Sequence, residues 1–350
     1  MSEPTIQRED VNAGRVIPRS VFDTAILPQR TAVENWQEQL EPICEARLSK
    51  DSDIDFHARV ESFVLDKIAI GDMQITAQAF DRSRFCIARH NVEHYVLHFF
   101  RSGRLVCRNT ETGSRLEPGD MLVADMTHPQ RMALTDIDFL HVAIPRPLLA
   151  PLLIEPDAYP IRHIRGDNIL VKMLHDQMYS LVSHAHRITV TQAQALMPAV
   201  LQLSAAAING MIAERTADGV HQSLMQAIRR HISSHALDRD LSPQKIAAHF
   251  GISRRKLSYL FQEDGGIATH IQNERLRLAR QALMDPAQRG RTIGEIAEAH
   301  GFSHRTSFIR AFERVYDLTP SQQRALASVR LQARTAVPAD HAPFRWVGLG

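Results

Sequence analysis

The sequence predicts an α+β protein of several domains, in which an N-terminal antiparallel β barrel or sandwich with added helices precedes an all-helical C-terminal region. Three observations support this fold class. Short β-branched or aromatic runs separated by turn residues occupy about 55–145, residues rich in Leu, Met, Ala and Gln follow at helical spacing, and a helical repeat lies within 221–325. The 350 residues, 44 % of them hydrophobic, suffice for two or three domains with cores of their own.

The charge of the chain is distributed unevenly. The whole sequence carries 41 Lys and Arg residues against 39 Asp and Glu residues, a formal charge of only +2. Residues 1–220 hold 22 basic and 28 acidic side chains, whereas residues 221–325 hold 16 basic and 10 acidic ones. The near-neutral total therefore combines an acidic part with a basic part, and only the basic part is suited to the phosphates of a nucleic acid.

The cysteines and the N-terminal residues indicate in which cellular compartment the protein is expected. Cys44, Cys86 and Cys107 are odd in number and show neither a CxxC pair nor zinc-ligand spacing, which argues against a disulfide framework or a structural metal site. The opening MSEPTIQRED lacks the basic and apolar segments of a signal peptide, and no apolar run approaches the roughly 20 residues of a spanning helix. We expect a soluble cytoplasmic protein with no membrane partner.

The first 160 residues are expected to form a β domain after a flexible lead-in. Residues 1–20 are polar, and we interpret them as the lead-in. The runs expected to be strands lie within 21–160 and are Val60–Leu65, Gln74–Phe80, His94–Phe100, Arg104–Arg108, Met121–Ala124 and Phe139–Ile144. Arg101-Ser102-Gly103 predicts a hairpin between two of these strands, and Glu117-Pro118-Gly119-Asp120 predicts a turn before the next one.

Residues 161–218 are predicted to be helical. The apolar residues that recur three to four positions apart are Ile169, Met173, Leu174, Met178 and Leu181. Such a stripe could cover an open side of the β domain or pair two copies of the chain, and the sequence does not choose between these explanations. We therefore assign 161–218 as a helical linker or dimerisation region.

A repeat with an offset of fifty residues determines the interpretation of residues 221–325. The repeated segments are Ile246-Ala247 with Gly251-Ile252-Ser253 and, fifty positions later, Ile296-Ala297 with Gly301-Phe302-Ser303. In each copy alanine allows a close helix crossing, glycine tolerates a positive φ in a tight turn, and serine is expected to cap the next helix. The spacing predicts two helix-turn-helix units, at about 241–262 and 292–313.

Helix starts and a connecting helix support these units. Ser242-Pro243 and Thr319-Pro320 place a capping hydroxyl before a proline at the first helical position, and Thr292 with Glu295 forms a capping box. Residues 267–284 are expected to form one helix of about 27 Å, at 1.5 Å per residue. That length could hold two recognition helices about one DNA turn, roughly 34 Å, apart on one face of the duplex.

The second helix of each unit carries side chains that could read DNA. The residues expected to face inward are Leu257, Leu260, Phe261, Phe308 and Phe312. The residues expected to face outward are Arg254, Arg255, Ser258 and Tyr259 in the first unit and His304, Arg305, Thr306 and Arg310 in the second. Because side chains of these types contact base edges or phosphates near the start of a recognition helix, we predict that they bind double-stranded DNA.

Two stretches resemble a known family. GISRRKLSYLF and GFSHRTSFIRAFERVYDLTPSQQR are similar to the paired helix-turn-helix domain of the AraC/XylS family of bacterial transcription regulators. The residues at characteristic positions of that family's C-terminal signature are Gly301, Phe302, Ser303, Phe308, Arg310, Phe312, Pro320 and Arg324. Asp317 stands where glycine is usual, and Glu313 stands where a basic residue is commoner. The resemblance implies that 221–325 is an AraC-type DNA-binding domain.

The resemblance also implies a promoter-binding regulator with a sensing domain. Pro118-Gly119-Asp120 and Ile144-Pro145-Arg146 resemble the cupin-like domain of members that control catabolic operons, which makes 21–160 a cupin-like effector-binding domain. We predict a homodimer that responds to a small-molecule effector, contacts RNA polymerase, activates a catabolic operon and is associated with the bacterial nucleoid when bound. Residues 326–350 lack a sustained period and are expected to form a flexible tail.

Other chemistry is less well supported. His90, His94 and His98 would share one side of a strand, but the HxH pair and downstream glutamate of metal-binding cupins are missing. No Ser-His-Asp order, glycine-rich phosphate loop or paired-carboxylate spacing indicates catalysis. We predict no enzyme activity, no catalytic residue, no metal and no cofactor. The alternatives are a cupin-type metal enzyme fused to a DNA-binding domain and a constitutive architectural DNA binder.

Five further residues leave alternatives open, and no effector-binding residue is assigned. Cys86 and Cys107 are interpreted as small buried hydrophobic residues, with redox sensing as the alternative. Arg82, Arg84 and Arg89 could bind an effector carboxylate or could lie at a solvated strand edge.

Overall fold

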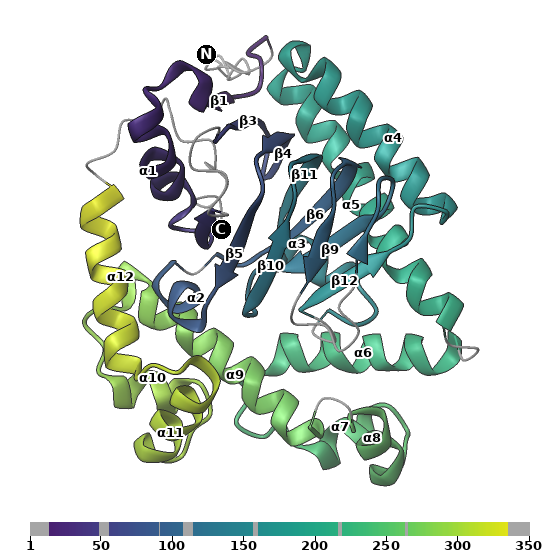
Figure 1. Ribbon diagram of the computed structural model, residues 1–350. Coiled ribbons are helices and arrows are strands. Elements are labelled where there is room, and N and C mark those ends of the chain that lie inside the picture. The colour runs from purple at the N-terminus through teal and green to yellow at the C-terminus, as the bar shows by residue number, and fades with distance from the viewer. Residues whose placement is uncertain are drawn as a thin grey trace, which may run out of the picture.

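The structure is a computed structural model that describes the backbone of residues 14–48, 56–90, 92–107, 115–156, 160–215, 219–262 and 265–334 (Figure 1). Residues 1–13 of the predicted lead-in and residues 335–350 of the predicted tail lie outside these ranges. Residues 326–334 are helical, so the predicted start of the tail is wrong. Strands and their covering helices form the first part of the chain, and the helices that follow residue 219 lie along one side of them (Figure 1).

Two antiparallel sheets form the N-terminal region, which confirms the predicted α+β class. The seven-stranded sheet has the order β1 (Arg19–Asp23), β3 (Ala58–Leu65), β4 (Ile68–Ile75), β11 (Ile137–Pro145), β6 (His94–Ser102), β9 (Met121–Asp125) and β12 (Ile161–Ile164). The five-stranded sheet has the order β2 (Glu45–Leu48), β5 (Gln78–Arg82), β10 (Gln130–Leu134), β7 (Leu105–Cys107) and β8 (Arg115–Leu116). The sheets do not close into a barrel, and β12 extends the larger sheet past residue 160.

The two sheets share one hydrophobic core. Val96 and Phe139 of the larger sheet pack in one cluster with Leu134 of the smaller sheet. Trp36, on α1 (Gln29–Leu40), is fully buried in the same cluster, and its Nε1 donates a hydrogen bond to Gln78 Oε1 at 2.9 Å. This bond satisfies the one polar atom of the indole ring, which can therefore be buried at little cost.

The predicted strand Gln74–Phe80 is wrong, because the chain leaves one sheet for the other within it. β4 ends at Ile75 and β5 begins at Gln78. The crossing is held by polar bonds: Thr76 Oγ1 accepts from the His57 amide at 2.8 Å, and Asp136 Oδ1 accepts from the Ala77 amide at 2.8 Å. An alternating run of residues predicts extended backbone, but it does not show where the chain passes between sheets.

The two predicted turns have different outcomes. The turn before β9 is confirmed, since the Asp120 amide donates to the Glu117 carbonyl at 3.0 Å and Gly119 has a φ of +93°. The predicted hairpin at 101–103 is wrong, because β6 and β7 belong to different sheets. Gly103, with a φ of +85°, instead turns the chain from the larger sheet to the smaller one.

Two long helices cover the outer side of the larger sheet (Figure 1). α4 (Ile169–His184) buries Val171, Leu174 and Met178 in a cluster shared with the sheet and with α5 (Val190–Arg215). Ile169, 66 % exposed, and Met173, 53 % exposed, lie outside that cluster. One side of the helix therefore covers its own domain, and the other remains open to solvent. Among the described residues, no helix combines the length and apolarity needed to cross a bilayer.

Candidate nucleic-acid interface

The first helix-turn-helix unit consists of α7 (Pro243–His249) and α8 (Arg254–Leu260). The turn between them contains Gly251, with a φ of +62°, and the Ile252 amide donates to the Ala247 carbonyl at 3.0 Å. Ser253 Oγ accepts a hydrogen bond from the Lys256 amide at 3.1 Å and caps α8 as predicted.

The second unit, α10 (Ile293–Ala299) and α11 (Arg305–Tyr316), has the same turn with a different helix start. Gly301 has a φ of +78°, and the Phe302 amide donates to the Ala297 carbonyl at 3.0 Å. The expectation that Ser303 caps this helix is wrong. The N-cap is His304, whose backbone is extended and whose side chain makes no capping bond.

The remaining predicted helix starts agree with the structure. Thr292 and Glu295 form a capping box at the start of α10. Ser242 Oγ accepts from the Lys245 amide at the start of α7, and Thr319 Oγ1 accepts from the Gln322 amide at the start of α12 (Pro320–Arg334). These caps depend only on residues three positions apart, which explains why the sequence predicts them.

The helix α9 (Ile267–Met284), with the bounds predicted, joins the two units. Ile267 and Ile271 near its start belong to the core of the first unit, which also contains residues of α6 (Gly219–His235). Leu276 and Leu283 near its end belong to the core of the second. The two units lie at opposite ends of α9, on the side of the molecule away from the sheets (Figure 1).

All eight predicted DNA-reading side chains are exposed. They are Arg254, Arg255, Ser258 and Tyr259 on α8, and His304, Arg305, Thr306 and Arg310 at or on α11. Tyr259 is 71 % exposed, whereas Leu257, Phe261, Phe308 and Phe312 are fully buried and Leu260 is partly buried. Each recognition helix therefore has one side that forms the unit's core and one side that is free to contact a ligand.

The charged groups on these helices are available for DNA phosphates and bases. Within the described residues, none of Arg254, Arg255, Arg305 and Arg310 forms an ion pair with a carboxylate. Three of these arginines lie in the first turn of their helix, and the backbone amides of a first turn also attract phosphate. Lys256 and Ser307 are exposed on the same helices and are further candidates for DNA contact.

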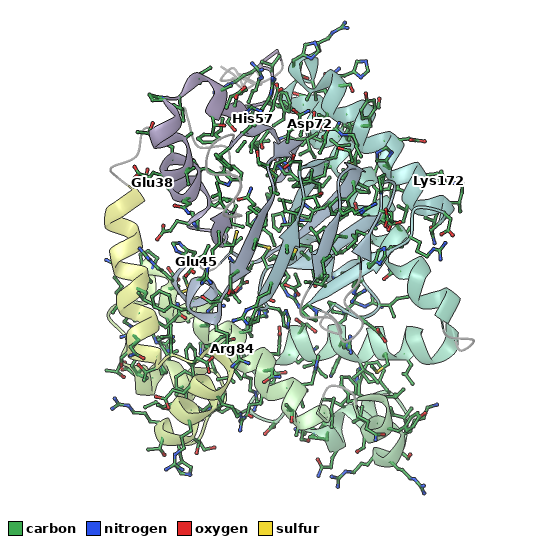
Figure 2. The ribbon with its side chains drawn as sticks, in the orientation of Figure 1. Glu38, Glu45, His57, Asp72, Arg84 and Lys172 are labelled. Atoms are coloured by element: carbon green, nitrogen blue, oxygen red, sulfur yellow. The ribbon has the colours of Figure 1, made fainter. Side chains whose placement is uncertain are left out.

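The second unit is bonded to the β domain through α2 (Arg84–His90). Arg280 Nη2 on α9 donates to the Ile87 carbonyl at 2.6 Å, and Gln323 Nε2 on α12 donates to the Ala88 carbonyl at 2.6 Å. Both donors are buried, at 3 % and 0 % exposure, so these bonds are shielded from water. An exposed ion pair of 3.0 Å joins Arg84 Nη1 to Asp317 Oδ2 at the rim, where Arg84 faces the helical region (Figure 2).

A small cavity of about 80 Å³ lies between the two sheets. Its lining includes His98 and His141, and burial lowers the pKa of His98 to about 3, with a smaller contribution from the charge of His141. Burial also lowers the pKa of His141 to about 4, so both rings are neutral at physiological pH. His90 lies on α2 and not on a strand, which corrects the predicted row of three histidines. No group of three or more His, Cys, Asp or Glu side chains in the described ranges could hold a metal ion.

Arg82, Arg84 and Arg89 have different surroundings. Arg82 is buried and donates to the carbonyls of Met126 and Ile43, whereas Arg84 and Arg89 pair with different carboxylates. The three guanidinium groups therefore have separate partners. Cys86 and Cys107 are buried and reduced, and burial raises the pKa of both thiols, that of Cys107 to about 12. Buried neutral thiols of this kind are poor nucleophiles.

Two family models match most of the chain. Residues 41–209 match the AraC-binding-like domain, and residues 246–325 match a helix-turn-helix domain. The first match covers strands β2 to β12 with α2 to α4 and most of α5, and the second begins within α7 and continues through α8 to α11. This chain belongs to the AraC/XylS family of transcription regulators.

Two curated transcription regulators match part of the chain. The probable transcriptional regulator LumQ of Photobacterium leiognathi is 29 % identical over 100 residues, which are 28 % of this chain and 39 % of that protein. The regulatory protein PocR of Salmonella typhimurium (strain LT2) is 31 % identical over 106 residues, which are 30 % of this chain and 34 % of that protein. The chain thus matches less than half the length of either relative.

One solved structure shares the fold over most of the chain. The AraC-like transcriptional activator CuxR has a TM-score of 0.52 and 21 % sequence identity, and the alignment covers 75 % of this chain and 95 % of that one. The family's arrangement of a β domain followed by two helix-turn-helix units is therefore present here.

Proposed function

We propose that this protein is a sequence-specific DNA-binding transcription regulator that responds to a small-molecule effector. The observation that carries the proposal is the pair of recognition helices, each with its apolar side buried and its predicted DNA-reading side chains exposed. Two such helices fixed at the ends of α9 could enter successive major grooves on one side of a duplex.

In this proposal the two kinds of exposed side chain have different tasks. Arg255 and Arg305 lie in the first turn of α8 and α11, where a guanidinium can form two hydrogen bonds with the edge of a guanine. Other basic groups bind phosphates and contribute affinity without specificity. Each phosphate contact releases counterions, so the affinity falls as the salt concentration rises.

The β domain would supply the response. An effector that binds one arrangement of this domain more tightly shifts the population toward that arrangement and changes how the helical region is held. We further propose a homodimer that uses the exposed side of α4, with Ile169 and Met173, and activates a catabolic promoter through RNA polymerase. A cytoplasmic location follows from this function.

Selection of bound genomic fragments by the full chain, with and without small acids, amines and aromatic compounds, tests the proposal. We expect a small set of fragments with a shared sequence, and affinity for them that decreases linearly with the logarithm of salt concentration. The double variant Arg255→Ala/Arg305→Ala should lose this enrichment, whereas Arg165→Ala, an exposed arginine of the β domain, should keep it. Equal recovery of all fragments would contradict sequence-specific binding.

A further inference from the structure

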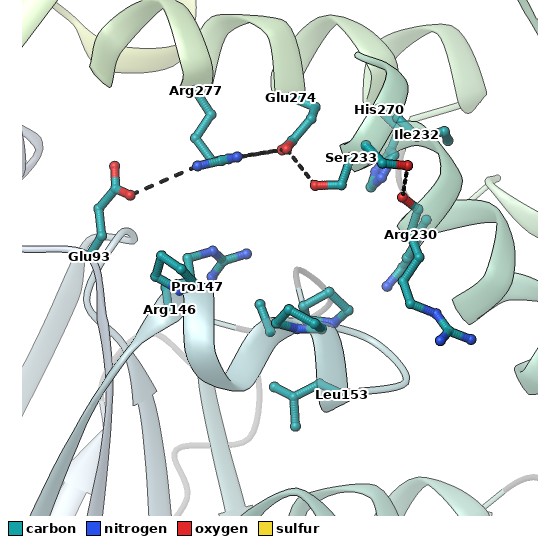
Figure 3. A pocket seen from close by; sticks show the side chains of 15 residues that line it. Glu93, Arg146, Pro147, Leu153, Arg230, Ile232, Ser233, His270, Glu274 and Arg277 are labelled. Carbon is teal, nitrogen blue, oxygen red and sulfur yellow. Dashed lines mark hydrogen bonds and ion pairs between the residues drawn. The ribbon is translucent and has the colours of Figure 1, made fainter. Parts of the chain in front are cut away.

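A pocket of about 400 Å³ lies between the β domain and the helices α6 and α9 (Figure 3). One wall comes from α3 (Arg146–Leu149) and the short helix η2 (Ala150–Leu152), which directly follow β11 of the larger sheet. The other wall comes from residues of α6 and α9, the helices that hold the first helix-turn-helix unit. A molecule bound here would touch the β domain and the helical region together.

The two walls of this pocket differ in chemistry. The wall from the β domain is largely apolar, with Pro147, Ala150, Pro151 and Leu153. Four arginines line the pocket against two glutamates, and the arginines still outnumber the carboxylates when Asp125, the buried partner of Arg146, is included. The lining therefore favours an anionic group on one side and an apolar group on the other.

Part of the charged wall is fixed before any ligand arrives. Arg277 donates two hydrogen bonds to Glu274, at 2.9 and 2.7 Å, and Ser233 Oγ donates to the same carboxylate at 2.8 Å (Figure 3). Burial alone would raise the pKa of Glu274, but these bonds and the charge of Arg277 lower it, so the pair stays ionised. Because the charge of Arg277 balances that of Glu274, this carboxylate does not compete with an anion for Arg230.

Two neighbouring arginines of α6 are placed to receive that anion. Arg229 is 7 % exposed, and its guanidinium carbon lies 5.9 Å from the centre of the Phe261 ring in the core of the first unit. Arg230 is exposed and lines the same pocket. Phe261 directly follows the recognition helix α8, so a shift of Arg229 on binding would change how the end of that helix packs.

We infer that this pocket binds an organic carboxylate with a compact apolar body. The carboxylate lies against the arginines of α6, and the body packs on the proline-rich wall of the β domain. The volume falls within the range of small-molecule sites, about 300–1,000 Å³. The bound acid ties α6 to the β domain and so fixes the first unit relative to the second. This site is separate from the cavity between the sheets.

Titration calorimetry of the full chain, without DNA, tests this inference independently of promoter binding. The probes are benzoate, cyclohexanecarboxylate, the uncharged benzamide and inorganic phosphate. We expect both carboxylates to bind, and benzamide and phosphate to bind at least about ten-fold more weakly, because each lacks either the charge or the apolar body. Arg230→Ala should weaken carboxylate binding about ten-fold, and the matched surface variant Arg165→Ala should not change it.

A second variant locates the acid. Ala150→Phe fills the pocket from the apolar wall and should abolish carboxylate binding. If the phenylalanine disturbs the fold, Arg230→Ala still tests the site, because Arg230 is exposed and its removal should leave the fold intact. The inference is overturned if neither carboxylate binds at about 1 mM, a free energy near −4 kcal/mol. Equal binding of benzamide, or full affinity in both variants, would also overturn it, since the acid would then lie elsewhere.

Discussion

The two helix-turn-helix units have the same turn but different surroundings. Gly251 and Gly301 both have positive φ, and the residue after each glycine donates the same hydrogen bond back to an alanine. Each unit adjoins a pocket at the β domain, and the second unit is in addition bonded to that domain by the buried side chains of Arg280 and Gln323. A repeated sequence therefore reproduces local geometry, while residues outside the repeat decide which unit is held rigidly.

The largest expected effect comes from removing the buried bond that holds the second unit. Arg280→Ala leaves the Ile87 carbonyl without its charged donor, at a cost of up to about 3 kcal/mol of unfolding free energy. Hydrogen exchange should show the second unit losing the protection that distinguishes it from the first. Arg314→Ala, an exposed arginine of α11 bonded to Gln272, is the control and should change little. Unchanged protection in Arg280→Ala would mean that α2 does not hold this unit.

The two units can be compared by how much an arginine of each contributes to DNA affinity. Arg305→Ala should lower the affinity for a selected operator by about 1–3 kcal/mol, the contribution of a two-bond contact to a base, and Arg255→Ala should have a similar effect. Mobility-shift titration at fixed salt measures both, with Arg239→Ala, exposed and paired with Glu298, as the control. If Arg305→Ala binds as tightly as the parent chain, its assignment to base recognition is wrong.

The difference in helix starts makes a smaller prediction. Ser253→Ala removes the cap of α8 and should destabilise the first unit by about 1 kcal/mol. Ser303→Ala should be nearly neutral, since His304 and not Ser303 is the N-cap of α11. Thermal unfolding of the two variants and the parent chain measures the loss of stability that each substitution causes. Equal losses would show that Ser303 also caps its helix.

The smallest expected effect is a pH dependence that is larger in the first unit than in the second. His231 stacks on His235 and His249 with ring centres 4.2 and 4.3 Å apart, and burial, followed by the charges of these two rings, lowers its pKa, while Asp238 acts in the opposite direction. The unfolded chain then binds more protons below its usual pKa near 6.5, so stability falls as the pH drops through that value.

Hydrogen exchange at pH 7 and pH 5 measures this dependence. The first unit should lose more protection than the second, whose His300 also has its pKa lowered by burial but has no stacked histidine partner in the described residues. His249→Gln removes one of the three rings and should reduce the difference. The same loss in both units would exclude the histidine stack as its cause.

Much of the DNA-binding region could be predicted because its signals are local. The glycine turns, four of the five expected caps and the bounds of α9 depend on residues a few positions apart. The predictions that were wrong depend on contacts or bounds that the local sequence pattern does not specify. The cap at Ser303 failed because α11 begins one residue later than α8 does in the repeat, and the strand over 74–80 failed because the chain changes sheets at Thr76.

The family, the two units and the side chains that they expose follow from the sequence alone, since helix periodicity and turn chemistry act within about ten residues. How the units are held depends on contacts between distant parts of the chain. Arg280 contacts Ile87, 193 positions away, and Gln323 contacts Ala88, 235 positions away. From the sequence, an arginine on a helix of a basic domain is expected to contact solvent or phosphate. Arg280 instead contacts a buried carbonyl, because packing brings the β domain and the helical region together.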